Sequence, residues 1–366
     1  MKRQQEEPAS QKEESVPQRK AVKYNQELTL LTLPTDILDL IFQDLSRQDA
    51  INLSTLDHEH RNVLKAIVFS RIRASWNDMR SEIDGRTGFL KQHRHLVTQL
   101  RIVDCDSYGE WNMDIFSDLL IDLPRLRHLL INSKFSSNWL KYRQDDNLQQ
   151  LTLYFEPQDT RQVPGEIVSS SSTTTTTTTI NRIFSLEHIA NFKMLTKLRL
   201  WHYHLYWEDV YPVLIVEDVE VHNCTWEFPF TLSQFNYNSN IRRLVVSYAE
   251  GNAFAVSERY REFLQHGNGE DFSSLEELTV TVARGSLNSS VMSRFMNTGN
   301  FPRLRALRVL AREGAYNLSH WFGKLPTNST LRVLDMQVDY EARDRERALK
   351  EANRYFPFLD VKIHRP

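Results

Sequence analysis

Between residues 33 and 68 the apolar positions follow a helical spacing. A Leu33-Pro34 pair keeps the chain extended before Pro34, whose fixed φ and missing donor suit the first turn of a helix. Asp36 falls in that first turn, where the helix dipole stabilises a carboxylate. The helix should carry one broad apolar face, made by Ile37, Leu38, Ile41, Phe42 and Leu45.

Two further short helices are predicted by capping residues. Ser46 with Asp49 three residues later fits the capping-box pattern and begins a second helix, which carries Leu53. Asp57 is placed to cap a third. The third helix should point four apolar residues inward: Val63, Leu64, Ile67 and Val68. Because three helices in about 35 residues make only a marginal core, part of this apolar surface should meet a partner.

From residue 95 onward a different pattern repeats, with an apolar residue at the first, fourth and sixth positions of each unit. The units begin at Val97, Leu126, Leu148, Leu195, Val216, Ile241, Leu275, Leu304, Leu331 and Phe358. Successive units begin 21 to 34 residues apart, except for one step of 47 that contains an insertion. Apolar residues at positions 4 and 6 have the period of a strand with one buried face. The spacing is typical of leucine-rich repeats, in which each strand is followed by a return segment.

The two cysteines of the chain fit the same register. Cys105 and Cys224 both fall at position 9 of their units, where a leucine-rich repeat places Asn or Cys to satisfy the backbone at the turn after the strand. Both are therefore expected to be structural. The return segments are expected to include helices at 115–123 and 260–264.

The predicted fold class is α/β. A three-helix module at 28–68 and a helical linker at 69–94 precede an irregular leucine-rich-repeat solenoid at 95–366, which is a curved parallel sheet with helices or loops outside it. Residues 1–27 are polar and charged, and they are expected to form a disordered arm. The Ser/Thr-rich stretch within 157–180 has no packing pattern and is expected to be a disordered insertion.

The composition gives no support to several classes of partner. Lys+Arg number 45 and Asp+Glu 47, so no overall field favours nucleic acid or an anionic membrane. Two cysteines make no disulfide framework, no apolar stretch is long enough to span a bilayer, and the N-terminus lacks the apolar region of a secretory signal. We expect an intracellular protein, in the cytoplasm, the nucleus or both.

No catalytic constellation is recognisable. Glycine is scarce, with 11 residues, and neither a GxxxxGK[ST] loop nor a GxGxxG motif is present, so a nucleotide phosphate has no backbone cradle. Three His-x-His pairs occur, at 58 and 60, 93 and 95, and 202 and 204, but none has a third ligand at a defined spacing. We expect no enzymatic activity, metal or cofactor.

The N-terminal residues resemble the F-box, a helical module of ubiquitin-ligase receptors. The resemblance rests on Leu33-Pro34, an acid at Asp36, the apolar residues from Ile37 to Leu45, an acid at Asp49, and Leu53. It covers about 40 residues and is most specific in its first half. The sequence departs from the family at 57–61, where members commonly carry Cys or Val and then Trp.

An F-box followed by leucine-rich repeats resembles the substrate receptors of Skp–cullin–F-box (SCF) ubiquitin ligases. The resemblance implies that the module binds a Skp-type adaptor, and through it a cullin scaffold, while the repeats bind a protein substrate. The adaptor-binding residues would be Leu33, Pro34, Ile37, Leu38, Ile41, Phe42, Leu45 and Leu53. Two alternatives stay open: an F-box protein that acts with the adaptor in an assembly that ubiquitinates nothing, and a repeat scaffold that binds no adaptor.

The repeat register also predicts where a substrate would bind. If positions 4 and 6 point inward, positions 3, 5 and 7 point outward from the same strands onto the concave face. Aromatic and arginine side chains, which dominate interface hot spots, gather there in the middle repeats. The predicted substrate-binding residues are Tyr154, Arg199, Trp201, Glu220, His222 and Arg243.

Overall fold

The chain folds as two compact units, residues 1–64 and 65–366. The structure is a computed structural model. It describes residues 30–86, 88–103, 120, 122–133, 137–142, 147–155, 183–189, 192–206, 215–226, 240–247, 273–282, 288–311, 316–340 and 342–365. The N-terminal arm at 1–27, the Ser/Thr insertion within 157–180, Cys105 and the return helix expected at 260–264 lie outside the described residues, as does most of the one expected at 115–123.

The first unit consists of short helices. They are η1 (Leu30–Thr32), α1 (Thr35–Asp44), α2 (Arg47–Ser54) and α3 (His58–Val68), the last of which continues into the second unit. Pro34 is the N-cap of α1. The Ser46 side chain accepts a hydrogen bond from the Asp49 amide at 3.2 Å, and Asp57 accepts one from the His60 amide at 2.8 Å. These two side-chain caps confirm the predicted starts of α2 and α3, because each satisfies an amide left without a partner in the first turn. Helix α1 begins directly after Pro34, as predicted, without a side-chain cap.

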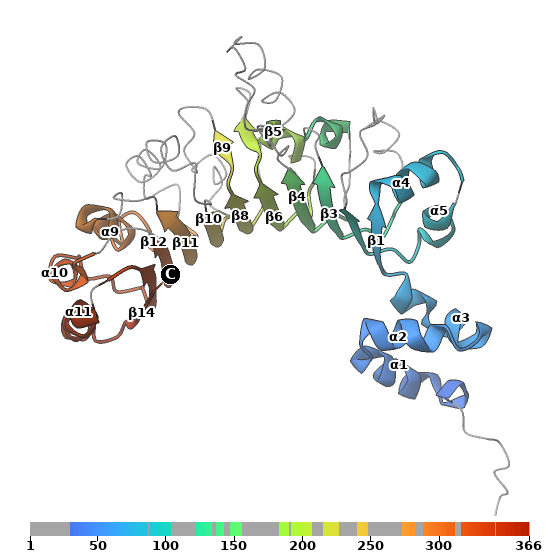
Figure 1. Ribbon diagram of the computed structural model, residues 1–366, viewed down its shortest axis with the longest axis horizontal. Coiled ribbons are helices and arrows are strands. Elements are labelled where there is room, and N and C mark those ends of the chain that lie inside the picture. The colour runs from blue at the N-terminus through green and yellow to red at the C-terminus, as the bar shows by residue number, and fades with distance from the viewer. Residues whose placement is uncertain are drawn as a thin grey trace, which may run out of the picture. The chain divides into compact units, whose positions relative to one another are not determined.

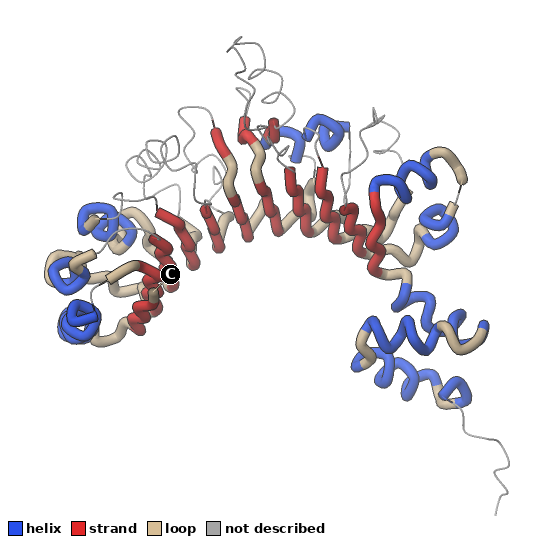
Figure 2. Tube along the Cα trace, in the orientation of Figure 1, coloured by secondary structure: helices blue, strands red, loops and turns tan. Residues whose placement is uncertain are grey.

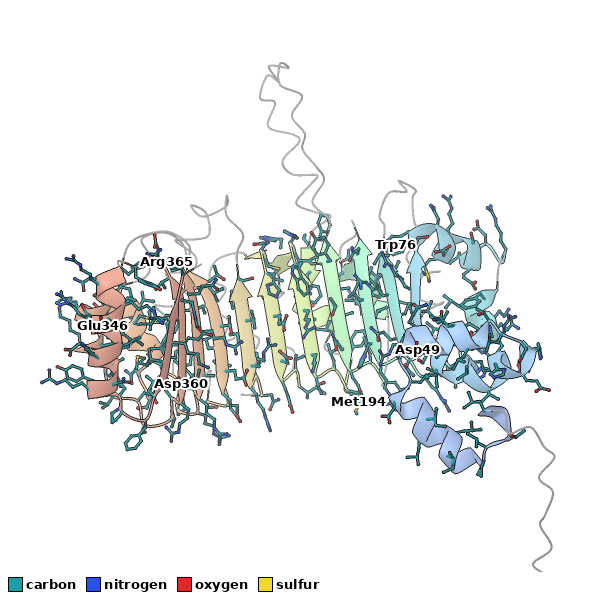
Figure 3. All side chains as sticks on the ribbon, turned by 60° about the horizontal axis from the view of Figure 1, so that its bottom comes forward. Asp49, Trp76, Met194, Glu346, Asp360 and Arg365 are labelled. Carbon is teal, nitrogen blue, oxygen red and sulfur yellow. The ribbon has the colours of Figure 1, made fainter. Side chains whose placement is uncertain are left out.

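The second unit is built on one parallel sheet of 11 strands, so the predicted α/β class is confirmed (Figure 1). The strands, in their spatial order, are β1 (Arg71–Ser75), β2 (Gln99–Val103), β3 (His128–Ser133), β4 (Gln150–Phe155), β6 (Lys197–Trp201), β8 (Asp218–His222), β10 (Arg243–Ser247), β11 (Glu277–Val282), β12 (Ala306–Ala311), β13 (Val333–Val338) and β14 (Asp360–His364). They lie side by side along an arc (Figure 2). Trp76, directly after β1, and Arg365, directly after β14, lie at the same edge of the sheet, as parallel strands require (Figure 3).

The pairing register agrees with the repeat pattern of the sequence. Leu100 lies opposite Leu129, which lies opposite Leu151, and the series continues through each later unit to Val361. The residues at positions 4 and 6 are buried in every unit except for the half-buried Val361. They form one continuous core on a single face of the sheet. The strand prediction is therefore confirmed, because a shift of one residue would expose every apolar side chain.

The last unit corrects the predicted register at its first position. Phe358 is the apolar residue that the repeat pattern assigns to this position, but it is 85% exposed, whereas its neighbour Leu359 is 8% exposed. The Leu359 amide donates to the Phe356 carbonyl oxygen at 3.0 Å, and the Leu304 amide donates to the Phe301 carbonyl oxygen at 3.3 Å in the same way. Leu359 thus replaces Phe358 in the core, because the last unit has one residue fewer between this turn and its strand.

The interpretation of residues 69–94 as a helical linker is wrong for Arg71–Ser75, which form the edge strand β1. Helices α4 (Trp76–Ile83) and α5 (Phe89–His93) follow it. Trp76 is buried, and its indole N–H donates to the Asn132 carbonyl oxygen at 2.6 Å. The strand forms because Ile72 and Ala74 add to the core beside β2. The pairing of β1 with β2 cannot be read from a local helical pattern.

Return segments differ along the sheet. Helices α9 (Ser289–Phe295), α10 (Leu318–Phe322) and α11 (Ala342–Tyr355) lie on the outer side of the arc (Figure 2). In the middle the returns include η2 (Ser137–Tyr142), η3 (Leu186–Ile189) and a second, three-stranded parallel sheet of β5 (Ile183–Ser185), β7 (His204–Tyr206) and β9 (Thr225–Trp226).

Position 8 turns the chain from the large sheet to the small one. His202 and Asn223 occupy it, with φ of 63° and 51°, a left-handed conformation that non-glycine residues adopt at a cost. The next residues, Tyr203 and Cys224, are buried. The Cys224 thiol contacts the Leu200 and His222 carbonyl oxygens at 3.6 and 3.4 Å, so its predicted structural role is confirmed.

Candidate functional site

The predicted substrate-binding residues come from four neighbouring strands. Tyr154 lies on β4, Arg199 and Trp201 on β6, Glu220 and His222 on β8, and Arg243 on β10. Parallel pairing puts Arg199 opposite Glu220 and Trp201 opposite His222. Because outward positions of adjacent strands are about 4.8 Å apart, residues distant in sequence form rows across the sheet.

Glu220 is the centre of a charged network. One carboxylate oxygen, Oε1, lies 2.6 Å from Arg243 Nη1 and 3.2 Å from Arg199 Nη2. The other oxygen lies 3.3 Å from His222 Nε2. Arg243 also donates to Asp218 at 2.6 Å. The Glu220 side chain is only 13% exposed, so these partners replace most of its water.

These contacts hold the network in its charged form. The pKa of Glu220 is lowered to about 2, first by the hydrogen bond from His222 and then, against the opposing effect of burial, by the hydrogen bond and charge of Arg243 and the charge of Arg199. Burial alone would lower the pKa of Arg243, but its bonds to Glu220 and Asp218 raise it. A carboxylate with so low a pKa is a weak base at neutral pH, so the arrangement suits recognition better than proton transfer.

Aromatic rings extend this network along the strands. Trp201 stacks on His222, with ring centroids 4.4 Å apart and planes 15° from parallel. The other imidazole nitrogen, Nδ1, lies 2.5 Å from Ser247 Oγ. Tyr154 lies opposite Trp201 in register, but its ring meets His202 edge-on, with centroids 5.2 Å apart.

We call the connected group the central cluster: Arg199, Trp201, Asp218, Glu220, His222, Arg243 and Ser247. The sequence prediction omitted Asp218 and Ser247, although both occupy outward positions of their strands. The strand register could have identified both, because Asp218 lies opposite Arg243 and Ser247 lies opposite His222. The Nε of Arg199 is buried without a hydrogen-bond partner, although its Nη2 pairs with Glu220.

The predicted adaptor-binding residues lie on α1, on α2 and in the turns beside them. Ile37 is 44% exposed and Pro34 is exposed, whereas Leu38 is buried. The remaining described members are half-buried: Leu33, Ile41, Leu45 and Leu53. The Phe42 side chain lies outside the described residues.

The first unit exposes further apolar side chains beyond the predicted adaptor-binding residues. Leu40 and Leu56 are exposed, and so is Val63, which was expected to point inward. Leu40 escaped notice because it lies off the apolar face that the helical spacing defines. Leu64, the neighbour of Val63, is buried as predicted.

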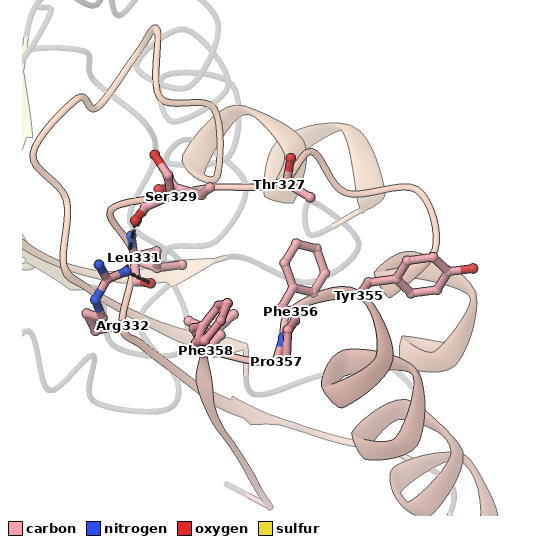
Figure 4. Close-up of a pocket in the computed structure, with 10 residues that line it drawn as sticks. Thr327, Ser329, Leu331, Arg332, Tyr355, Phe356, Pro357 and Phe358 are labelled. Carbon is pink, nitrogen blue, oxygen red and sulfur yellow. Dashed lines mark hydrogen bonds between the residues drawn. The ribbon is translucent and has the colours of Figure 1, made fainter.

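A pocket of about 620 Å³ lies at the end of the second unit, beside the turn between α11 and β14 (Figure 4). Its lining residues are Thr327, Asn328, Ser329, Leu331, Arg332, Tyr355, Phe356, Pro357, Phe358 and Leu359. The guanidinium of Arg332 donates a hydrogen bond to the Ser329 carbonyl oxygen at 2.8 Å, so it bonds to the backbone of its own chain. No motif in the sequence indicated this pocket.

Within the described ranges the histidine pairs do not come together with further metal-ligating side chains. Among the described residues there is no group of three or more His, Cys, Asp or Glu side chains placed to hold a metal ion. His60 bonds to Asp57 at 2.7 Å, and His93 stacks on Phe69 with ring centroids 4.1 Å apart. The pKa of His93 is lowered by burial and by the charges of His95 and Lys65.

One serine–histidine contact has the appearance of a nucleophile and base. Ser137 Oγ lies 2.9 Å from His188 Nδ1. However, Ser137 is fully buried, and its hydroxyl also accepts a hydrogen bond from the Ser185 amide at 3.0 Å. A nucleophile must reach a substrate, so we interpret these contacts as structural: they join η2 to η3 and to β5.

No family model matches this chain, and no curated protein sequence is significantly similar to it. None of the helices in the described ranges combines the length and the apolar character needed to cross a membrane.

Proposed function

We propose that this chain is the substrate-recognition subunit of an SCF-type E3 ubiquitin ligase. In this proposal the first unit is an F-box-like module that binds a Skp-type adaptor and, through it, a cullin scaffold. The second unit is an irregular leucine-rich-repeat solenoid that holds a protein substrate on its outward face. The chain acts without catalysis in the cytoplasm or nucleus and raises the effective concentration of substrate near a ubiquitin-loaded enzyme.

The observation that carries the proposal is the exposed apolar surface of the first unit. Nine large apolar side chains are exposed in the described part of the chain, and four belong to this unit: Ile37, Leu40, Leu56 and Val63. Such a concentration in so small a unit is a feature of interaction sites. Ile37 lies on the helix that carries the F-box resemblance, which makes a Skp-type adaptor the preferred occupant.

The second unit supports the other half of the proposal. Its parallel strands bury their apolar residues on one face of the sheet. This is the arrangement of a repeat solenoid, in which neighbouring units pack against each other to form the core. Its outward face presents the central cluster, in which aromatic and arginine groups are held in place by short contacts. Preorganised groups of this kind favour binding because less entropy is lost when a partner docks.

Two alternatives share part of this reasoning. An F-box protein that works with the adaptor alone would use the same face of the first unit, and a repeat scaffold would use only the second. Affinity purification of the tagged full chain separates them. Adaptor together with cullin supports the ligase, adaptor alone supports the first alternative, and recovery of neither contradicts the proposal.

A matched pair of variants tests the docking face. Ile37→Asp combined with Ile41→Asp should weaken adaptor binding at least tenfold. An isoleucine that becomes fully buried when the adaptor binds would contribute roughly 1.5 to 3 kcal/mol, and every 1.4 kcal/mol is tenfold in affinity. Ile215→Asp is the control, because Ile215 is similarly exposed, at 38%, but belongs to the second unit. Adaptor binding that survives the double change would contradict the proposed role of this face.

A further inference from the structure

The outward face of the first five strands of the large sheet is positively charged. Position 3 carries Arg71, Gln99, His128, Gln150 and Lys197 on β1, β2, β3, β4 and β6 in turn. Position 5 carries Arg73 and Arg101 on β1 and β2. We call Arg71, Arg73, Arg101, His128 and Lys197 the basic strip. All five are exposed, and the outward positions of these strands include no carboxylate.

Two arginines of the basic strip face each other across adjacent strands. Arg73 and Arg101 are directly opposite in the pairing of β1 with β2, and like charges in that position destabilise a sheet. Neither guanidinium forms an ion pair with a carboxylate of the described residues. Burial, followed by the charges of Lys197, Arg71 and Arg127, lowers the pKa of His128, so the positive charge of the strip comes from its arginines and Lys197.

The rest of the same face is organised differently. From β8 onward the outward cations have acidic neighbours: Arg243 pairs with Asp218 and Glu220, Arg308 lies 3.8 Å from Asp335, and Lys362 lies 3.2 Å from Asp360. Their charges are largely compensated within the chain. Among the described outward cations, Arg73 and Arg101 are a facing pair without a carboxylate partner.

We infer that the basic strip binds an acidic polypeptide segment, a run of Asp and Glu residues that lies extended across β1 to β6. Carboxylates meet exposed arginine and lysine groups there, and the amides of Gln99 and Gln150, which lie between the cations in the same row, can bond to the peptide backbone. The inference rests on the proposed function only in taking the segment to belong to the substrate.

The geometry sets the length of the segment. Arg71 and Lys197 are four strand spacings apart, which is roughly 19 Å at about 4.8 Å per spacing. An extended chain rises about 3.3 Å per residue and places alternate side chains on one face. A segment of about six or seven residues, with acids at alternate positions or throughout, covers the strip.

A polypeptide is favoured over a nucleic acid by the charge of the whole chain. Nucleic-acid-binding domains usually carry a strong positive balance that attracts the phosphate backbone over a distance. Here the formal net charge is −2. A short acidic segment needs only local complementarity, which the basic strip provides.

The test uses the purified full chain without any adaptor and a fluorescently labelled Glu-rich peptide of about eight residues, with binding followed by anisotropy. Arg73→Gln combined with Arg101→Gln should weaken binding about fivefold or more, because two exposed charge pairs are lost. Binding should also weaken as salt is raised. Arg308→Gln combined with Lys362→Gln is the control. It removes two cations that also occupy position 5 of their strands but have acidic neighbours, and it should change affinity less than twofold.

Three results would overturn the inference: unchanged affinity in the Arg73/Arg101 variant, equal affinity for a Gln-rich peptide, or stronger binding to a single-stranded oligonucleotide of equal charge. The Arg73/Arg101 variant should be at least as stable to urea as the native chain, because it relieves repulsion between two arginines. A stability loss would show that the two side chains have another structural role. Peptide binding without adaptor binding would contradict the proposed ligase function and leave this inference intact.

Discussion

Replacing Glu220 by glutamine tests how the central cluster is held together. The substitution keeps the size of the side chain and one acceptor oxygen, but it removes the negative charge that faces Arg199, His222 and Arg243. Arg243 keeps Asp218, whereas Arg199 has no other acidic partner among the described residues. The variant should therefore leave an uncompensated, half-buried cation in the middle of the sheet.

The magnitude follows from the pKa of Glu220. The pKa falls from 4.5 to about 2 on folding, and each unit of difference corresponds to about 1.4 kcal/mol. The charged form of Glu220 thus contributes about 3 kcal/mol to the free energy of unfolding at neutral pH. Because the glutamine oxygen can still accept a hydrogen bond, we expect Glu220→Gln to lower the free energy of unfolding by about 2 to 3 kcal/mol.

The pH dependence has a definite sign and window. The folded-state pKa lies below the unfolded value, so the unfolded chain binds more protons between these two values. The stabilisation by Glu220 is complete above pH 4.5 and is lost as the pH falls toward about 2. Urea denaturation at pH 7 and at pH 3 should therefore show a smaller difference in Glu220→Gln than in the native chain.

Glu277→Gln is the matched control. Glu277 is an outward glutamate on the next strand but one, 59% exposed, and its contact with Arg243 is 3.8 Å long. Exposed pairs of this kind contribute at most about 1 kcal/mol. The reasoning would be refuted if the two variants lost equal stability, or if the pH dependence of the native chain persisted in Glu220→Gln.

Three further predictions concern the fold. Asn223→Val should lower the free energy of unfolding by at least about 1 kcal/mol more than Asn223→Gly does in urea denaturation, because Asn223 has a φ of 51°, which valine adopts at a cost and glycine does not. Leu359→Ala should cost about 2 to 5 kcal/mol and Phe358→Ala less than about 1, because only Leu359 is buried; the reverse order would contradict the corrected register. In a Cys105→Ser background, Cys224 should react with a thiol reagent only when the chain unfolds, since it is buried, and fast reaction of the native protein would exclude the described packing.

The strand register of the large sheet could be predicted because it depends on residues that are close together in the sequence. An apolar pair such as Leu100 and Ile102 specifies which face is buried, and a one-residue shift would expose both side chains. The same logic failed at Phe358 because the number of residues between a turn and its strand is not fixed by the pattern. Only packing shows that Leu359 fills the position that Leu304 fills in an earlier unit.

The candidate sites depended on more than periodicity. Outward positions could be identified from the sequence, but which of them bond was decided by pairing: Arg199 meets Glu220 because β6 lies beside β8. The facing arginines Arg73 and Arg101 were not foreseen, since Arg73 lies in a segment predicted to be helical. Exposure in the first unit likewise followed from packing, which buries Leu64 and leaves Val63 at the surface.

The sequence by itself determined the α/β class, the starts of the three N-terminal helices, and the inward direction of positions 4 and 6 in each repeat. These features follow from interactions within about one turn or one strand, where the spacing of apolar and capping residues is sufficient. The tertiary structure decided that β1 adds a strand to the sheet, and it decided which outward charges are paired and which are not. Those outcomes depend on contacts between residues 20 or more positions apart, and no local pattern encodes the strand that will lie alongside.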